Sequence, residues 1–194
     1  YENPVLRWLK EHEWDACGYN YRKVDGMAVV NRDPLRRFED IPNTYKSTSI
    51  HKVSGSSSYA ESVFKIIEDI RSRNETVSQG DIAVIFVDKS NYIYDAIHEL
   101  NNIISSRLGW MVNVSFETKK SDPSKFFISN INNAKGLEFP FVICFAMNLN
   151  RNASFRNGLY TMMARSFLES HLVIGNSSNS VLLDKLNEGL NYLN

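Results

Sequence analysis

Two short stretches of the sequence hold residues that could bind a phosphorylated ligand. The first is residues 133–139, Asn-Ala-Lys-Gly-Leu-Glu-Phe, which follows an apolar run. Gly136 permits a tight turn and a close approach of backbone amides to a ligand. Lys135 can face a phosphate, and Glu138 can accept hydrogen bonds from sugar hydroxyls. These three residues are therefore candidates for contacts to a nucleotide.

The second stretch contains a single arginine in an apolar setting. Arg165 lies within residues 159–168, among leucine, methionine, alanine and phenylalanine. A guanidinium is always charged, so it needs an anionic partner wherever it is buried. One such partner is a phosphoryl group in transfer, whose charge an arginine finger stabilises.

Each stretch also has a purely structural interpretation. Residues 135–138 could form an ordinary strand-to-helix turn with a solvated lysine and glutamate, because short glycine motifs often occur without function. Arg165 could pair with a carboxylate such as that of Glu169, or extend to solvent along an apolar surface. Taken residue by residue, the sequence favours these structural interpretations.

Strands and helices that would position both stretches alternate from residue 54 onward. Continuous apolar runs predict strands buried on both faces, and apolar positions three and four apart predict helices. The expected strands are 47–53, 82–87, 111–116, 126–129, 141–147 and 171–174, and the expected helices are 60–70, 93–104, 157–168 and 183–193. Ser58 and Glu61 have the spacing of a capping box, and Ser90 could cap the next helix.

This alternation predicts an α/β fold with a mostly parallel sheet and helices on both faces. Ligands of such sheets bind at the carboxyl ends of the strands. The loop after strand 126–129 and the helix after strand 141–147 both leave the sheet at that end. We therefore expect both stretches to lie there, with Arg165 inside the helix 157–168.

Residues 1–50 have the least regular pattern. Apolar spacing predicts a helix within 2–14, residues 27–30 could form a short strand, and two prolines make 32–49 an extended connection. We expect residues 1–50 to be an irregular connecting segment that packs on a domain formed by residues 51–194.

Composition restricts the class of protein. Lys plus Arg and Asp plus Glu number 22 each, so nucleic-acid binding would need a local groove rather than a basic face. No apolar run reaches the ~18 residues of a membrane span. Cys17 and Cys144 make no disulfide framework, and the dispersed histidines suggest no metal site. We expect a cytoplasmic protein with no membrane partner.

In their order and context, the two stretches resemble motifs of UvrD/Rep-type superfamily 1 helicases. Residues 127–143 look like motif V of that family, and residues 157–166 look like motif VI. The interval between them fits, as does the apolar strand after the arginine. The resemblance extends over about residues 50–194 and implies the second RecA-like domain of a helicase motor, within a longer polypeptide.

The resemblance implies roles for most of the candidate residues. Arg165 would reach the γ-phosphate of ATP, Glu138 would contact the ribose, and Gly136 would let the loop close on the nucleotide. Asn130 and Asn132 would face single-stranded DNA, with RNA left open. ATP and Mg²⁺ would be held mainly by an N-terminal RecA-like domain of the same polypeptide, so we expect this chain alone to lack ATPase activity.

The sequence departs from the family in several places. Asn130 and Asn132 stand where many relatives have Thr-x-His, and asparagine cannot take a proton at neutral pH. Ala164 replaces a common threonine, which removes a hydroxyl but not the guanidinium. Residues 19–22 superficially resemble motif IV, but no helix follows, so we reject that match. A non-catalytic interaction module with a RecA-like fold therefore stays open, whereas an unrelated α/β enzyme would need a nucleophile–base pair or glycine-rich first loop that the sequence lacks.

Overall fold

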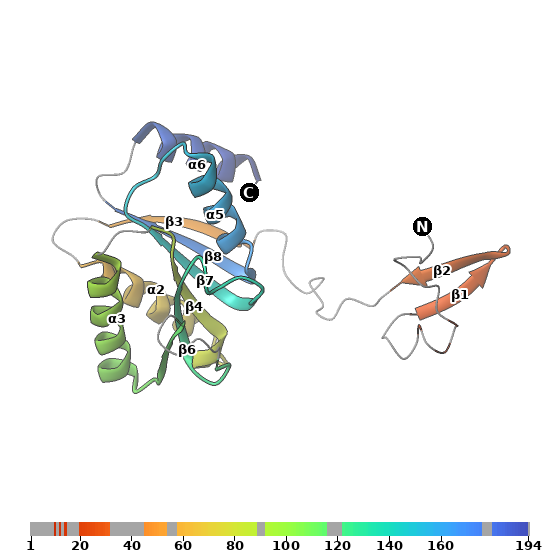
Figure 1. Cartoon of the computed structure of the whole chain (residues 1–194), viewed down its shortest axis with the longest axis horizontal. Coiled ribbons are helices and arrows are strands. Elements are labelled where there is room, and N and C mark those ends of the chain that lie inside the picture. The colour runs from red at the N-terminus through yellow and green to blue at the C-terminus, as the bar shows by residue number, and fades with distance from the viewer. Residues whose placement is uncertain are drawn as a thin grey trace, which may run out of the picture. The chain divides into compact units, whose positions relative to one another are not determined.

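The chain folds as two units, Tyr1–Tyr45 and Lys46–Asn194. The computed structural model describes residues 10, 12, 14, 20–31, 45–53, 58–88, 92–115, 122–175 and 180–193, and Figure 1 labels their helices and strands. Most of the expected helix at 2–14 and of the expected connection at 32–49 lies outside the described residues, as do Cys17 and Ser90.

A β-hairpin makes up most of the described part of the first unit. Strands β1 (Asn20–Val24) and β2 (Met27–Asn31) pair antiparallel. The two residues of the turn, Asp25 and Gly26, have positive φ angles of 52° and 81°. Asp-Gly is favoured in such turns because both central residues are left-handed. The expected strand at 27–30 is confirmed, and β1 is an addition that this dipeptide could have signalled.

A six-stranded sheet forms the second unit, in the order β3-β8-β7-β4-β6-β5, and its pairings are parallel throughout. Its strands are β3 (Thr48–Lys52), β4 (Ile82–Phe86), β5 (Val112–Val114), β6 (Phe126–Asn130), β7 (Phe139–Ala146) and β8 (Ser166–Ile174). β4 is buried along its whole length, as expected for a central parallel strand covered on both faces. The expected α/β fold is confirmed.

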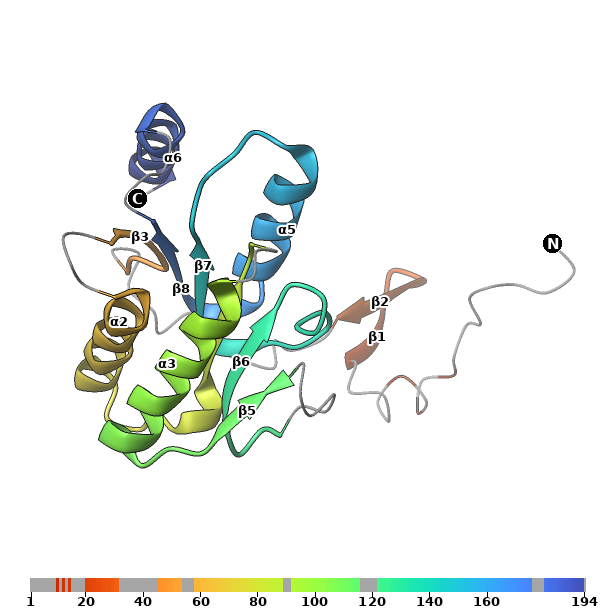
Figure 2. The ribbon, with the colours of Figure 1, turned by 60° about the vertical axis from the view of Figure 1, so that its left-hand side comes forward.

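Helices cover both faces of this sheet, as Figures 1 and 2 show. They are α2 (Tyr59–Arg73), α3 (Tyr92–Leu108), α5 (Ala153–Met163) and α6 (Ser180–Leu193), with a short 3-10 helix η1 (Gln79–Asp81) before β4. α2 and α3 share one apolar cluster with the sheet, in which Ile67 and Leu100 are fully buried. α5 and α6 contribute Met162 and Leu183 to a second cluster on the other face.

The start of α2 agrees only in part with the expected capping box. Ser58 caps the helix as predicted, because its Oγ accepts the N–H of Glu61 at 3.1 Å. The Glu61 carboxylate instead accepts from Arg107 of α3, at 2.5 and 3.1 Å. The pair Glu61–Arg107 thus joins the two helices that cover this face.

Arg165 does not lie inside a helix, and the expected helix 157–168 is wrong at both ends. Asn152 caps α5 earlier, through a hydrogen bond from the Ser154 N–H at 2.8 Å, and α5 ends at Met163. β8 begins at Ser166 rather than at residue 171. The apolar residues at 167 and 168 fit a helix or a strand, and pairing with β7 decides for the strand.

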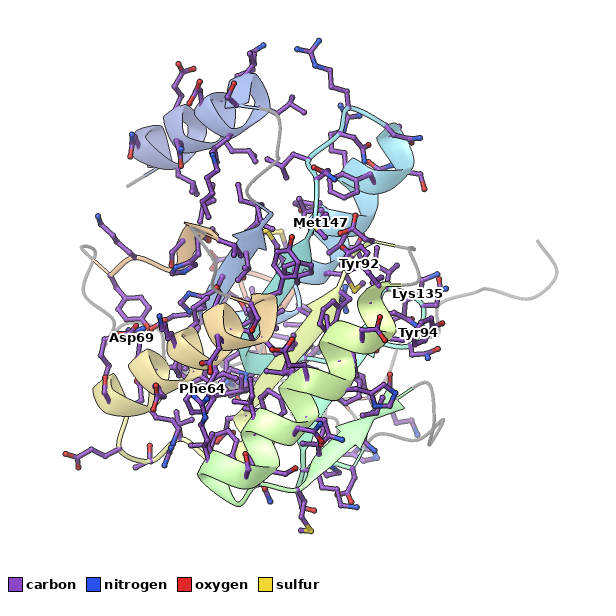
Figure 3. All side chains as sticks on the ribbon, turned by 90° about the vertical axis from the view of Figure 1, so that its left-hand side faces the viewer. Phe64, Asp69, Tyr92, Tyr94, Lys135 and Met147 are labelled. Carbon is purple, nitrogen blue, oxygen red and sulfur yellow. The ribbon has the colours of Figure 1, made fainter. Side chains whose placement is uncertain are left out.

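A partly buried network of charged groups joins α2 to the sheet. Arg73 donates to both carboxylate oxygens of Glu169, at 2.8 and 3.0 Å, and also binds Asp69, which Figure 3 labels on α2. The Glu169 side chain is 3% exposed and also contacts His171 at 3.1 Å. His171 contacts His51 of β3. Burial and the neighbouring His171 lower the pKa of His51, and Asp69 opposes that shift.

Cys144 is fully buried in β7, and burial raises the pKa of its thiol. Within the described ranges, the structure contains no helix both long and apolar enough to cross a membrane.

Removing the guanidinium of Arg73 should destabilise the second unit. Arg73→Met leaves the carboxylate of Glu169 buried without its bidentate partner, and breaking a buried pair from one side costs about 3–5 kcal/mol. Because the Arg73 side chain is 42% exposed, we expect a smaller loss, about 2 kcal/mol in the free energy of unfolding by urea.

Lys65→Met is the matched control, because Lys65 is exposed on the same helix, and it should change stability by less than about 0.5 kcal/mol. Adding Glu169→Gln to Arg73→Met should recover much of the loss, since no buried charge is then left unpaired. Equal losses for Arg73→Met and Lys65→Met would show that the network does not stabilise the unit.

Candidate functional site

Glu138 and Arg165 lie next to each other at the amino end of the sheet. β7 begins at Phe139 and β8 at Ser166, and these two residues are partners in the parallel pairing. The Phe139 N–H donates to the Arg165 carbonyl at 2.9 Å. The residues just before the two strands are therefore neighbours, and the two stretches singled out in the sequence meet at one edge.

The end of α5 fixes the backbone of Arg165 and the base of its guanidinium. The last four carbonyls of a helix need donors from outside the regular pattern or from its final turn. Here the donors are the N–H of Ala164, the N–H and Nε of Arg165, and the Oγ of Ser170. Arg165 Nε donates to the Thr161 carbonyl at 3.1 Å, where a cation also complements the negative end of the helix dipole.

The outer nitrogens of Arg165 make no ion pair with the described part of the chain. The proposed structural pair of Arg165 with Glu169 is wrong, because Glu169 is bound by Arg73 and His171. Arg165 is half-buried and Glu138 is exposed. A guanidinium tethered through Nε, with its outer N–H groups facing no described carboxylate, can bind a phosphate that approaches from outside the domain.

Gly136 is required by the conformation of the turn. Its φ is +80°, and a Cβ built on it would meet nothing within 4 Å. The position therefore excludes other residues by backbone strain rather than by crowding. The same open space leaves the backbone of the turn accessible to a ligand.

A second candidate site lies at the opposite edge of the sheet. A groove of about 700 Å³ opens beyond the carboxyl ends of β4, β6 and β7. Its lining includes Asp88 after β4, Asn132 and Lys135 after β6, and Asn152 and Phe155 at the start of α5. The lining combines side-chain amides, one lysine, one aspartate and one aromatic ring.

Lys135 belongs to this groove. In Figure 3 it lies near the first turn of α3, on the side of the molecule where Tyr92 and Met147 lie. The expectation that both stretches lie at the carboxyl ends is wrong for Glu138 and Arg165. Residues 131–138 cross from the carboxyl end of β6 to the amino end of β7, and any residue just before a parallel strand lies at the amino edge.

Asn130 and Asn132 differ in environment. The Oδ1 of Asn130 accepts the backbone N–H groups of Asn132 at 3.0 Å and of Asn133 at 3.3 Å. This is an Asx turn, in which the side chain replaces a backbone acceptor. Asn130 thus shapes the turn after β6, whereas Asn132 is exposed and lines the groove.

Several residues of the groove were missed by sequence reasoning. Phe155 lies in α5 before the expected start of that helix at residue 157, and Gly158 lies just after it. Asp88 follows β4. The Oδ2 of Asp88 accepts from the Met147 N–H and from Tyr92, so it joins two strand ends. The sequence could have pointed to these residues, because the strands were predicted and the grooves of parallel sheets form at the carboxyl ends of strands.

Contact between the crossing loop and α5 links the two edges. A Cβ on Gly158 would lie 2.9 Å from Cδ1 of Ile131, so a larger residue there would force the end of the Ile131 side chain to move. Residues 131–138 and α5 both extend from the groove to the turn of Arg165. Both elements therefore connect the groove with the turn of Arg165.

Comparison with known proteins agrees with the two motifs. Residues 125–173 match the family of UvrD-like helicase C-terminal domains. The resemblance to UvrD-type helicases is confirmed. The helicase match includes residues 131–138, α5 and the turn of Arg165, and so it includes most of both candidate sites.

The fold is shared with a solved helicase domain. The crystal structure of the C-terminal domain of a possible DNA helicase from Lactobacillus plantarum WCFS1 is 20% identical, with a TM-score of 0.53, over 75% of this chain and 84% of that one. Mss116p DEAD-box helicase domain 2, bound to an RNA duplex, is 17% identical with a TM-score of 0.39, over 67% of this chain and 54% of that one. A search of curated proteins gives no match.

Replacing Asn130 should destabilise the chain, whereas replacing Asn132 should not. Asn130→Ala removes the acceptor for two backbone N–H groups, a loss comparable to that of a helix cap, about 1 kcal/mol. Asn132→Ala removes an exposed side chain and should stay within about 0.5 kcal/mol of the wild type. Thermal unfolding followed by circular dichroism measures both, and equal effects would contradict the structural role of Asn130.

Proposed function

We propose that this chain is the carboxyl-terminal, second RecA-like domain of an ATP-dependent superfamily 1 DNA helicase or translocase. It would supply the arginine finger and part of the sites for ATP and single-stranded DNA. One observation supports this function most. Glu138 and Arg165 are neighbours in the backbone, directly before the paired amino ends of β7 and β8. We assign the function to the second unit, with the residues before it as a connecting segment.

The residues at the amino edge fit a nucleotide. Arg165 offers outer guanidinium N–H groups for phosphate oxygens, and the exposed carboxylate of Glu138 can accept from ribose hydroxyls. Gly136 leaves open space at the turn between them. When bound, ATP would supply the phosphoryl group whose transfer to water drives the motor, and Arg165 would stabilise the charge that develops on it.

The remaining parts of the nucleotide site would come from the N-terminal RecA-like domain of the same polypeptide. Among the described residues, no group of three or more His, Cys, Asp or Glu side chains is placed to hold a metal ion. As the family resemblance implies, that other domain would hold Mg²⁺ and the phosphate loop. Arg165 would act across the seam between the two domains, as an arginine finger does.

Movement along single-stranded DNA would follow from coupling of the two edges. Residues 131–138 run from the groove to Glu138, and α5 runs from the groove to the turn of Arg165. Closure of the two domains on ATP would displace these elements and change the grip of the groove on the strand. Directed movement is then a population shift that depends on different contacts to ATP and to its products.

Arg165→Ala in the complete protein should abolish DNA-stimulated ATP hydrolysis. Loss of an arginine finger lowers kcat by a factor on the order of 10³–10⁵. Arg165→Lys should recover only a small part, because an ammonium cannot bind phosphate oxygens through a planar fork. Steady-state ATPase rates measure both variants.

Arg156→Ala is the matched control, because it removes an exposed guanidinium from α5, the helix that precedes Arg165. A melting temperature is needed for each variant, since Arg165→Ala also removes the hydrogen bond to Thr161. A folded Arg165→Ala protein with an unchanged kcat would overturn the finger. It would favour the alternative, an interaction module that keeps a RecA-like fold without catalysis.

A further inference from the structure

The last carbonyl of α5 is bound by a side chain from another element. The carbonyls of residues 160–162 accept from the two residues that follow the helix, Ala164 and Arg165. The carbonyl of Met163 accepts instead from the Oγ of Ser170, in β8, at 2.7 Å. The sheet therefore holds the end of the helix through Ser170, two residues before Arg165.

A second hydroxyl extends this connection. The Oγ atoms of Ser166 and Ser170 lie 2.6 Å apart. A hydroxyl carries one proton, and the proton of Ser170 is directed at the Met163 carbonyl. Ser166 therefore donates to Ser170. These hydrogen bonds join the first residue of β8 to the last residue of α5, and they close a loop around the two residues between them, Ala164 and Arg165.

Ser170 itself is held firmly, because its backbone lies between two neighbouring strands. It is the pairing partner of Thr48 in β3 and of Val142 in β7, and its N–H donates to the Ser47 carbonyl at 2.8 Å. The residue is 6% exposed. Its hydroxyl is thus a fixed point of the sheet against which the end of α5 is placed.

Without this hydroxyl, the end of α5 would lose its connection to β8. The Met163 carbonyl would be left without its donor, and an unpaired carbonyl away from water costs more than the hydrogen bond it replaces. The last turn would rearrange to find another donor. Because Nε of Arg165 is bound to the carbonyl of Thr161 in that same turn, the guanidinium would move with it. A displacement of about 1 Å can lower a reaction rate about 10²-fold.

We propose, deepening the function proposed above and resting on it, that Ser170 is a positioning residue for the arginine finger. It does not contact the nucleotide. Through the carbonyl of Met163 it holds the turn that directs Arg165 toward the phosphoryl group, and Ser166 supports it by donating to its hydroxyl.

The test is steady-state, DNA-stimulated ATP hydrolysis by the complete protein. Ser170→Ala should lower kcat roughly 10- to 100-fold. The KM for ATP should change less than about 3-fold, because the finger acts on charge that develops in the transition state. Ser170→Thr keeps the hydroxyl and should restore kcat to within about 3-fold of the wild type. Its added methyl group has room, since Ser170 lines a cavity of about 630 Å³ together with Leu159 and Met163.

Ser115→Ala is the matched control, because it also breaks a buried pair of serine hydroxyls. The Oγ of Ser115 donates to the Oγ of Ser129 at 2.7 Å, and both residues are buried. Ser115 directly follows β5, and three strands separate β5 from β8. In the 194-residue chain, Ser115→Ala and Ser170→Ala should lower the melting temperature similarly, by roughly 2–4 °C. Only Ser170→Ala should lower kcat.

NMR of the 194-residue chain supplies a readout that does not need catalysis. The Nε–H group of Arg165 donates to Thr161, so its proton should exchange slowly with water. The signal is assigned by its loss in Arg165→Lys. Ser170→Ala should speed this exchange on the order of tenfold, because the last turn of α5 opens more often, whereas Ser115→Ala should leave it unchanged.

Four results would overturn the role of Ser170. They are a kcat of Ser170→Ala within about 3-fold of the wild type, an equal loss of kcat in Ser115→Ala, a folded Ser170→Thr as slow as Ser170→Ala, and unchanged exchange at Nε of Arg165. Failure of the proposed motor looks different, because Arg165→Ala would then keep its kcat. An inactive Arg165→Ala beside a fully active Ser170→Ala contradicts only the positioning role.

Discussion

The turn that joins α5 to β8 fixes the position of Arg165, and the candidate site at the amino edge of the sheet depends on it. Its backbone is held by the last carbonyls of α5 on one side and by the first hydrogen bond between β7 and β8 on the other. The Nε of Arg165 is part of the same arrangement. The guanidinium is therefore positioned by groups that the fold needs in any case, and its outer nitrogens are left for a ligand.

The parallel sheet places the two candidate sites at opposite edges. Residues just before strands gather at the amino edge, where Glu138 adjoins Arg165, and residues just after strands gather at the carboxyl edge, where the groove opens. Residues 131–138 and α5 cross between these edges and touch at Ile131 and Gly158. In the function proposed above, these two elements would couple ATP at one edge to a nucleic-acid strand at the other.

Much of the fold follows from the sequence because buried parallel strands leave a strong signal. The apolar runs at 82–87 and 141–147 and the cap at Ser58 correspond to observed elements. The end of α5 at Met163 could not be predicted from the sequence. The residues after it suit a helix as well as a strand, and only their pairing with β7 decides for the strand. The partner of Glu169 could not be predicted either, since Arg73 lies on a distant helix.

Hydrogen exchange of the complete protein, followed by mass spectrometry, tests the separation of the two edges most directly. A non-hydrolysable ATP analogue should protect residues 136–139 and 164–167, and an oligonucleotide alone should protect residues 131–135 and 150–156. Protection of the groove by the analogue, with none around Arg165, would contradict the placement of the nucleotide at the amino edge and the account built on it.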